Sequence, residues 1–418
     1  MKQENKAYFS ASLGNVLEFY DFALYGFFAS VLSEEFFPLK TPLNSLLLTF
    51  GVFAVGFLAR PLGAMIFGLI GDKYGRRTCL SGSLIGIAFA TTAIGLLPTY
   101  ATWGVAAPIC LTFLRILQGI CLGGEYSNSL IFVSEYLERF RNKYPAFSLG
   151  CVSAMGVVGW FMASLLGIYF KNNGDFLFSW RIPFLLGSIV GVIGYYIRKH
   201  IEDAYESDAK SIPFFEGLKE LWRYPKQCFQ VMSVGILMGS LFYGQFIFSY
   251  SFLPLVTNLS ASLVNKAVSI ALFSYILFLP FVGWIADRLG HKRLLIFSCV
   301  ASFFLSPFLF YLSTSGQFYQ VVISQTVVAF ILSALMSPGT YYMSLAFPPQ
   351  IRCSAASVSY NIGATLFGGM APSVGIMLYK LFQTPIACAI FLSTSALIAG
   401  IGFSTIQVSK RYQEQEGF

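Results

Sequence analysis

Long apolar stretches separated by short polar segments make up almost the whole chain. Twelve of them reach about 17 residues or more, the length that a helix needs to cross the hydrocarbon core of a bilayer. They lie at residues 8–32, 45–70, 79–97, 105–136, 146–169, 182–198, 228–256, 264–286, 294–313, 317–346, 353–379 and 384–408. They lack the alternation typical of strands, and only helices or closed barrels satisfy the backbone in lipid. The pattern predicts an all-α membrane protein with twelve transmembrane helices.

Composition and charge support this class and fix an orientation. The chain is 56% hydrophobic and only 11% charged, which excludes an ordinary soluble protein of this length. Most basic residues fall in alternate loops, so the positive-inside rule predicts that both termini face the cytoplasm. The net charge of +8 then reflects topology and contact with anionic lipid, not nucleic acid. The first residues carry no signal-peptide pattern. We expect a monomeric multi-pass protein of a bacterial inner membrane.

Residue types that carry enzymatic chemistry are sparse. The eight cysteines are scattered and show no metal-ligand spacing, so we interpret them as small packing residues. Both histidines, His200 and His291, fall in expected cytoplasmic loops. No phosphate-binding glycine loop with a lysine occurs, which disfavours an ATP-driven pump. The sequence therefore predicts neither an enzyme nor a resident metal or cofactor.

A loop motif occurs twice, at equivalent places in two groups of six helices. One copy runs from Gly68 through Asp72 to Gly75, and the other runs from Gly283 through Asp287 to Gly290. In both, an aspartate is followed by a basic residue and a glycine that permits a tight turn. Parallel repeats of six helices are typical of secondary transporters. The repeat predicts bundles at 1–198 and 228–408, a mixed-charge linker at 199–227 and a short tail at 409–418.

Charges deep inside the apolar stretches are confined to the first half, and the second-half stretches contain only Lys266, near the start of one of them. Residues 294–351 contain no Asp, Glu, Lys or Arg. The first-half stretches, in contrast, contain Glu18, Asp21, Arg60, Arg115 and Glu125. A charge in hydrocarbon costs several kcal/mol, so it persists mainly where it pairs or functions. Counting 1.5 Å per residue from each helix end suggests an upper pair of Asp21 with Arg115. The same count suggests a lower cluster of Glu18, Arg60 and Glu125.

Several further motifs resemble one transporter family. Gly14 and Asn15 followed by Glu18, Tyr20 and Asp21 are similar to the first helix of the metabolite:proton symporters of the major facilitator superfamily. The resemblance extends along nearly the whole chain, through Arg60-Pro61, Gly123-Gly124-Glu125-Tyr126, Trp180-Arg181, Phe347-Pro348 and Tyr360-Asn361. That family includes carriers of proline and betaine, 2-oxoglutarate, citrate and shikimate. The resemblance implies the twelve-helix fold and no enzymatic activity.

The resemblance also implies roles for the buried charges. Sugar porters of the same superfamily couple protons through an aspartate on helix 1 and an arginine on helix 4, which match Asp21 and Arg115. A solute that draws the arginine away would let the aspartate take a proton. The alternative is that buried arginine–carboxylate pairs are inert struts, and for Arg60 both interpretations stay open. Expected solute contacts on cavity-facing helices are Asn15, Tyr25, Gln118, Tyr126, Tyr243, Gln245, Gln325 and Tyr341.

Charges at the cytoplasmic ends of the helices are expected to form latches between the halves. The candidate gating residues are Asp72, Arg76, Glu135, Arg139, Asp287 and Arg352. The family usually places an acidic residue where this chain has Leu345, so we expect a weaker latch in the second half. On this basis, replacing Asp72 should open the cytoplasmic side more than replacing Asp287.

The leading functional hypothesis is proton-coupled uptake of a small organic acid, zwitterion or amino-acid-like solute by alternating access. A proton-independent facilitator or an exporter is the nearest alternative. A receptor that binds a solute without moving it is a third, although the chain contains no evident signalling domain. Sequence alone does not identify the solute, because carriers of very different solutes share these motifs.

Overall fold

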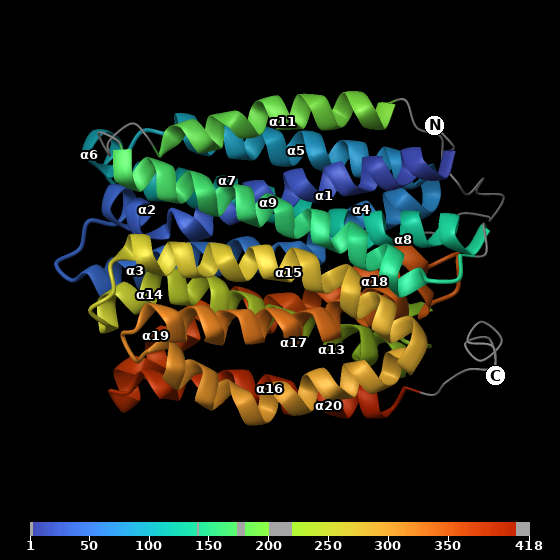
Figure 1. Cartoon of the computed structure of the whole chain (residues 1–418). Helices are drawn as coiled ribbons and strands as arrows, with labels where there is room; N and C mark the ends of the chain where they lie inside the picture. Colours follow the sequence, from blue (N-terminus) through green and yellow to red (C-terminus); the bar gives the residue numbers. More distant parts are fainter. Residues whose placement is uncertain (1–2, 140–141, 174–179, 200–219, 407–418) are drawn as a thin grey trace.

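The computed structural model describes residues 3–139, 142–173, 180–199 and 220–406. In these ranges the chain is helical, and the helices run side by side between the two ends of one elongated bundle (Figure 1). Before the gap at 200–219 the elements are α1 (Gln3–Phe27), α2 (Ala29–Phe36), α3 (Pro42–Leu58), α4 (Arg60–Tyr74), α5 (Arg76–Leu96), α6 (Tyr100–Trp103), α7 (Ala106–Gly123), α8 (Glu125–Arg139), α9 (Pro145–Asn173) and α11 (Arg181–Lys199). We call these the N-terminal half.

The C-terminal half follows the gap. Its elements are α13 (Pro225–Leu241), the π-helical turn η1 (Phe242–Ile247), α14 (Phe248–Val256), α15 (Ala261–Leu289), α16 (His291–Ser313), α17 (Phe318–Leu345), α18 (Arg352–Ala364), the π-helical turn η2 (Thr365–Gly369), α19 (Ala371–Phe382), the short 3-10 turn η3 (Pro385–Ala387) and α20 (Cys388–Ser404). Most of the expected linker lies outside the described residues, as does the expected tail.

Membrane-length helices account for most of the described residues. Ten are long and apolar enough to cross a bilayer, and an eleventh arises if α1 and α2, bent by 59°, form one span. The expected stretch at 182–198 corresponds to α11, which is not among those ten. The all-helical membrane class is therefore confirmed, whereas the count of twelve spans stays a prediction.

The repeated loop motif forms two equivalent turns. Gly75 joins α4 to α5 with a φ of 90°, and Gly290 joins α15 to α16 with a φ of 95°. Only glycine adopts such angles without strain, which explains why each copy of the motif needs a glycine there. Lys73, Arg139 and Arg288 lie at the same end of the bundle (the right in Figure 1), which we call the basic end.

Several spans are interrupted near their middle. The span at 42–74 breaks at Ala59, and the span at 106–139 breaks at Gly124. Helix breaks release backbone carbonyls, and two of these accept hydrogen bonds from the C-terminal half. Asn361 donates to the carbonyl of Gly123 over 2.8 Å, and Thr365 donates to the carbonyl of Phe57 over 2.7 Å. Because α18 and η2 supply these donors, the breaks are satisfied inside the protein, as lipid requires.

Small residues let α7 cross α3 and α4 at backbone contact. A Cβ atom on Gly119 would lie 1.9 Å from the carbonyl oxygen of Gly56, and one on Gly63 would lie 1.8 Å from that of Ile120. No side chain fits such a space, so these glycines are required by helix packing. The crossing fixes the height of Arg115 on α7 relative to that of Arg60 on α4.

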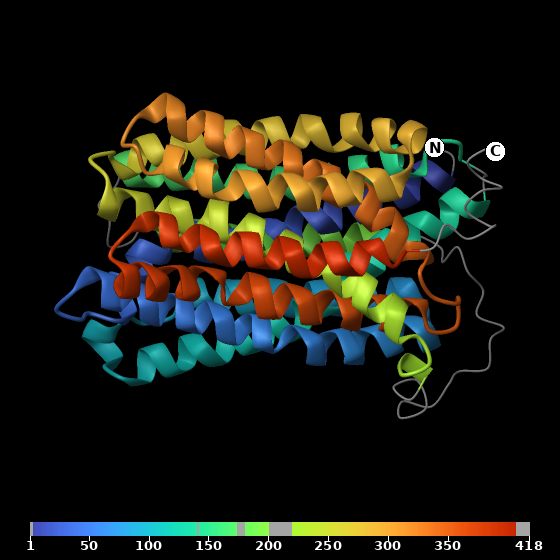
Figure 2. The same cartoon turned by 90° about the horizontal axis from the view of Figure 1, so that it is seen from below.

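The two halves meet along two helix pairs. α9 packs against α15, and α4 packs against α18; Figure 2 shows the same arrangement from below. The contacts are close: a Cβ on Gly283 would lie 2.5 Å from the Ala146 carbonyl, and one on Gly68 would lie 2.7 Å from the Ser354 Cα. The halves therefore touch through backbone at the basic end.

Candidate solute and proton site

The charged side chains expected inside the membrane are all buried in the N-terminal half. Glu18 and Glu125 are 0% exposed, Arg115 is 1% exposed, and Asp21 and Arg60 are 3% and 4% exposed. α1 supplies Glu18 and Asp21, α4 begins with Arg60, α8 begins with Glu125, and α7 supplies Arg115. At such burial each charge needs a compensating contact.

Glu18 and Arg60 form an ion pair. Their closest oxygen and nitrogen atoms are 3.9 Å apart. The Arg60 guanidinium also lies over the rings of Phe22 and Phe57, at 4.8 and 4.6 Å from their centroids. The expected proximity of Glu18 and Arg60 is thus confirmed. Glu125 begins α8, where the helix dipole favours an anion, and it accepts a hydrogen bond from Ser83.

Arg115 does not form the expected direct pair with Asp21. Within the described part of the chain no ion pair joins the two side chains, and Arg115 Nη1 donates a hydrogen bond to Gln118 Oε1. The guanidinium lies 4.2 Å from the centroid of the Tyr25 ring and 4.8 Å from that of Phe22. Its Nε and Nη2 atoms are buried and make no hydrogen bond to a described residue.

Asp21 faces α5 and α11 instead. A Cβ on Gly187 would lie 2.7 Å from Asp21 Oδ1 and 3.1 Å from Thr91 Cγ2, so these three residues are in contact. Gln118 Nε2 donates to Thr91 Oγ1 over 2.7 Å. Thr91 and Gln118 therefore stand between Asp21 and Arg115. The direct-pair expectation failed because counting residues gives the height of a side chain but not its direction around the helix.

A small cavity lies between the halves, near the middle of the bundle. The centre of a water molecule can move through about 20 Å³ of it. Its walls come from α1, α8 and α9 on one side and from α13, η1, α15 and α17 on the other. The lining residues are Phe19, Tyr126, Ser153, Gly156, Val157, Trp160, Met238, Phe242, Tyr275 and Met336. The cavity is narrow and almost entirely aromatic or apolar.

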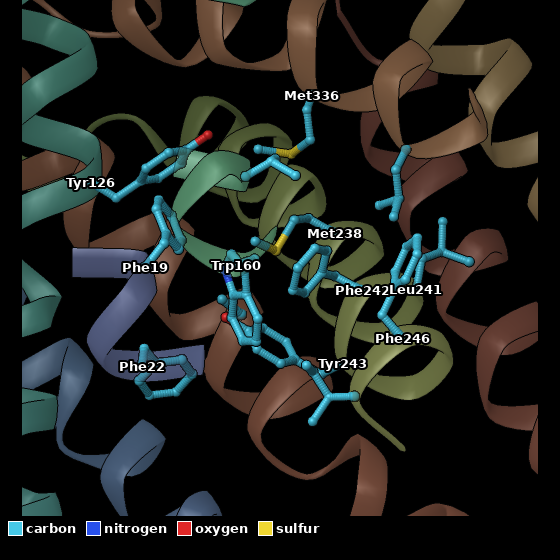
Figure 3. Close-up of a cluster of buried hydrophobic side chains, with 14 of the residues drawn as sticks. Phe19, Phe22, Tyr126, Trp160, Met238, Leu241, Phe242, Tyr243, Phe246 and Met336 are labelled. Atoms are coloured by element: carbon cyan, nitrogen blue, oxygen red, sulfur yellow. The ribbon is translucent and has the colours of Figure 1, made fainter. Parts of the chain in front are cut away.

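Aromatic rings form most of the surface around this cavity. Trp160 lies between the rings of α1 and those of η1, as Figure 3 shows. Its ring centroid is 4.8 Å from that of Phe242 and 6.0 Å from that of Tyr243. Phe22 connects this cluster to the charged layer, because its ring contacts both Trp160 and the Arg115 guanidinium. Ring faces of this kind attract cations.

The residues expected to bind solute separate into two groups. Tyr126 lines the cavity, and Tyr243 packs beside it. The others make contacts elsewhere. Asn15 accepts a hydrogen bond from Ser129, Tyr25 donates to the Thr49 carbonyl, Gln245 donates to Ser313 and Ser324, Gln325 donates to the Gln245 carbonyl, and Tyr341 packs against His291.

Sequence reasoning missed the cavity walls contributed by α9 and α15. Trp160 and Tyr275 come from these helices, and no residue of either helix was among the expected solute contacts. A tryptophan among the glycines of α9 was the available signal, because Gly156 and Gly159 bring the helix close to α1. In a chain with 44 phenylalanines, that signal was weak.

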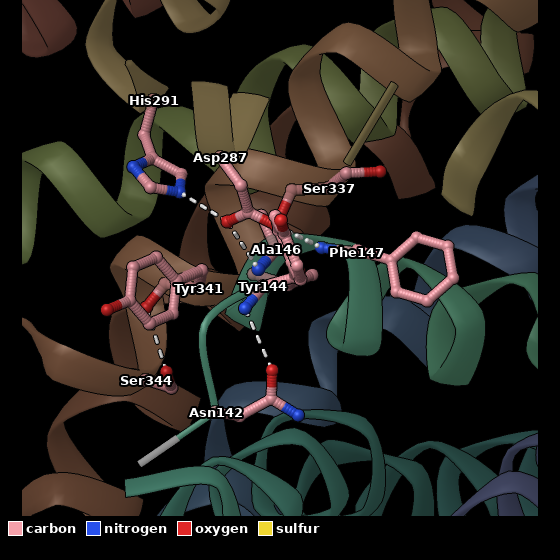
Figure 4. A network of polar contacts seen from close by, with 10 residues as sticks. Asn142, Tyr144, Ala146, Phe147, Asp287, His291, Ser337, Tyr341 and Ser344 are labelled. Atoms are coloured by element: carbon pink, nitrogen blue, oxygen red, sulfur yellow. Dashed lines mark hydrogen bonds and ion pairs between the residues drawn. The ribbon is translucent and has the colours of Figure 1, made fainter. Parts of the chain in front are cut away.

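At the basic end each motif aspartate contacts the start of a helix in the opposite half. Asp72 Oδ2 accepts a hydrogen bond of 3.0 Å from the backbone of Ser354 in α18. Asp287 accepts two, of 3.0 and 2.9 Å, from Ala146 and Phe147 at the start of α9 (Figure 4). Carboxylates are stabilising at helix N-termini, so both aspartates hold the halves together.

The second latch is not visibly weaker than the first. His291 Nε2 lies 3.2 Å from Asp287 Oδ1, and the His291 ring packs against Tyr341 (Figure 4). His291 was expected in a loop, but it begins α16 and is only 6% exposed. His200 lies outside the described residues. These contacts do not support the weakening inferred from Leu345.

The remaining gating candidates are arranged differently from the expectation. Arg352 pairs with Glu138 over 3.5 Å, an acid that sequence analysis did not select. Glu135 is buried and Arg139 is exposed. Arg76 begins α5, but its side chain is outside the described part of the structure.

Comparisons with known proteins agree with this architecture. Residues 11–263 and 234–416 match the family model of the Major Facilitator Superfamily. A proline/betaine transporter of Salmonella typhimurium is 30% identical, over 97% of this chain and 84% of its own length. An alpha-ketoglutarate permease of Escherichia coli is also 30% identical, over 88% and 86%. A putative proline/betaine transporter of Staphylococcus aureus is 29% identical over 100% and 91%.

Solved structures show the same fold at low sequence identity. The E. coli xylose transporter XylE in a partially occluded inward-open conformation superposes with a TM-score of 0.73 at 16% identity, over 97% of this chain and 98% of that one. The human organic anion transporter MFSD10 gives 0.71 at 14% identity, over 97% and 100%. These similarities concern the fold, and the relatives named above are transporters, not enzymes. The chain belongs to the Major Facilitator Superfamily.

Proposed function

We propose that this protein is a proton-coupled symporter that takes up a small zwitterion by alternating access. Twelve spans divide into bundles at 1–198 and 228–408, and both termini and the basic end face the cytoplasm of a bacterial cell. The observation that carries the proposal is a narrow aromatic cavity between the halves, next to five buried charged side chains of the N-terminal half, Glu18, Asp21, Arg60, Arg115 and Glu125. A cavity between halves and titratable groups beside it are the parts that coupled transport requires.

The chemistry of the cavity favours a quaternary ammonium zwitterion, of which glycine betaine is the simplest. Trp160, Phe242, Tyr126 and Tyr275 present aromatic faces, which bind such cations without competing hydrogen bonds. The Arg115 guanidinium still has two buried donors without a described partner, and a carboxylate accepts two parallel hydrogen bonds from a guanidinium. Phe22 separates the two places and moves aside as the solute spans them.

Coupling follows from competition for Arg115. In the empty carrier the guanidinium is held by Gln118 and aromatic faces. When the solute carboxylate takes it, the positive charge that favours an ionised Asp21 is screened, and the carboxyl takes a proton. Solute and proton then bind together and leave together, which is linkage between two ligands at one site.

Transport into proteoliposomes tests the proposal. Purified protein is reconstituted, and uptake of radiolabelled betaine, proline and 2-oxoglutarate is measured with and without an inside-alkaline pH gradient. We expect betaine to accumulate above its external concentration, and a protonophore to abolish the accumulation. Equilibration of betaine that ignores the gradient would instead support a facilitator. Accumulation of 2-oxoglutarate alone would contradict the proposed solute class.

A further inference from the structure

A directional chain of polar side chains runs from Arg115 to Asp21. A guanidinium only donates, an ionised carboxylate only accepts, and an amide or hydroxyl does both. Arg115 Nη1 donates to Gln118 Oε1, which turns the amide nitrogen of Gln118 toward Thr91. That nitrogen donates to Thr91 Oγ1 over 2.7 Å. The Thr91 hydroxyl therefore accepts one hydrogen bond, and its own hydrogen is still available to donate another.

Asp21 lies at the far end of this chain, beside Thr91. The Thr91 side chain interacts with the Asp21 carboxyl, and Gly187 holds both residues against α11. Thr92, the neighbour of Thr91, instead donates to the carbonyl of Ala88 one turn back in its own helix. The structure gives Thr91 no such bond to its own helix, so its hydroxyl is available to Asp21. All four groups are buried, and hydrogen bonds in a chain polarise one another where water is excluded.

We propose that Thr91 is a coupling residue, which transmits the state of Arg115 to Asp21 through Gln118. This inference rests on the proposed symport. When the solute carboxylate engages Arg115, Gln118 Oε1 loses its donor and the amide turns. Thr91 then loses the hydrogen bond that fixes its hydroxyl, and it stops donating to Asp21. The carboxyl takes one proton from the water on the side to which the carrier is open, and it returns that proton after the solute leaves.

The relay explains how two groups that do not touch can be linked. A hydrogen bond donated to the ionised form of a carboxyl favours that form, and its loss favours protonation. Thr91 keeps its own proton throughout, so it acts by positioning and not by transfer. Gln118, which sequence analysis assigned to the solute, has both polar atoms engaged in the chain.

Three variants separate this role from a structural one. Thr91→Val has nearly the same shape but cannot donate, Thr91→Ser restores the hydroxyl, and Thr92→Val removes only a bond within α5. Each is reconstituted, and two quantities are measured with radiolabelled betaine: counterflow without a gradient, and accumulation driven by a pH gradient. We expect Thr91→Val to retain counterflow while accumulation falls about tenfold, the effect of one pKa unit at the coupling acid. Thr91→Ser and Thr92→Val should accumulate betaine like the parent protein.

Other outcomes overturn the inference. Accumulation by Thr91→Val at the parent level would show that the hydroxyl plays no part in coupling. Parallel loss of counterflow and accumulation, without rescue by Thr91→Ser, would show a purely structural role. If the parent protein itself ignores the pH gradient, the proposed symport fails and the relay fails with it. If the parent protein accumulates betaine under the pH gradient and Thr91→Val accumulates it equally well, the proposed symport stands and the relay alone fails.

Discussion

Two buried residues, Asp21 and Trp160, are central to the proposals. Asp21 is 3% exposed, and its Oδ1 atom makes no hydrogen bond to a described residue. Trp160 is 1% exposed and lines the cavity. Both residues lie in the proposed solute and proton site, so replacing them tests the proposals directly.

Asp21→Asn should abolish proton-driven accumulation of betaine and leave counterflow partly intact. Asparagine keeps the shape of the side chain but cannot take up and release a proton. The measurement is the ratio of accumulated to external betaine under a pH gradient, with Glu34→Gln as control because Glu34 is exposed in the same half. Undiminished accumulation in Asp21→Asn would remove Asp21 from the coupling scheme.

Trp160→Ala should weaken betaine binding about tenfold or more, because a cation over a desolvated ring gains on the order of 1–2 kcal/mol. Trp160→Phe should lose less betaine affinity, since an aromatic face remains for the cation. The apparent dissociation constant for betaine is measured from the concentration dependence of counterflow. Trp222→Ala is the matched control, because that ring is 86% exposed. If Trp160→Ala bound proline and betaine as the parent does, the cavity would not be the solute site.

The packing of the helices determines the positions of the site residues. The close crossing of α7 over α3 puts Gly119 against the backbone of Gly56. Gly119→Ala should therefore lower the unfolding temperature in detergent markedly, since overpacking costs about 1–3 kcal/mol or more. Gly51→Ala is the matched control, because no atom lies within 4 Å of the added Cβ and alanine favours helix. Equal melting temperatures for the two variants would contradict the crossing.

The hydrogen bonds of the two motif aspartates lead to a prediction about opening of the basic end. Asp287 accepts two backbone hydrogen bonds from α9, and Asp72 accepts one from α18. We therefore expect Asp287→Ala to open the basic end at least as much as Asp72→Ala, the reverse of the expectation based on Leu345. Contacts worth about 1 kcal/mol shift a balanced equilibrium several-fold.

Cysteine accessibility measures that opening. A reporter cysteine is placed at the basic end on a background without the eight native cysteines, and its labelling rate is compared in the two variants. Glu34→Ala, on α2 at the opposite end, controls for nonspecific loosening. Faster labelling in Asp72→Ala than in Asp287→Ala would restore the original expectation.

The whole molecule is two halves in contact at both ends. Lys380 Nζ donates to Asn44 Oδ1 over 2.7 Å at the end opposite the basic one. A short bismaleimide joining cysteines at these two positions should abolish betaine counterflow, because alternating access needs the halves to part there. Either single cysteine treated with the same reagent serves as control. Full counterflow in the cross-linked protein would contradict rocking of the halves.

The sequence predicted the scaffold much better than the site. Apolar length identified ten spans that the structure supports, and the glycines of the repeated motif identified two turns that the structure confirms at Gly75 and Gly290. Residue counting also placed Glu18 and Arg60 at one height. It could not give the direction of Asp21 around α1, because counting residues fixes only the height of a side chain along its helix. The cavity rings escaped notice because aromatic residues occur throughout the chain.

The uneven distribution of charge has an electrical consequence. A membrane potential exerts force only on charges within its field, at about 2.3 kcal/mol per charge per 100 mV. Glu18, Asp21, Arg60 and Arg115 all belong to the N-terminal half, and residues 294–351 carry no acidic, lysine or arginine side chain. Movement of these four side chains in the field therefore displaces charge, whereas movement of residues 294–351 is electrically silent.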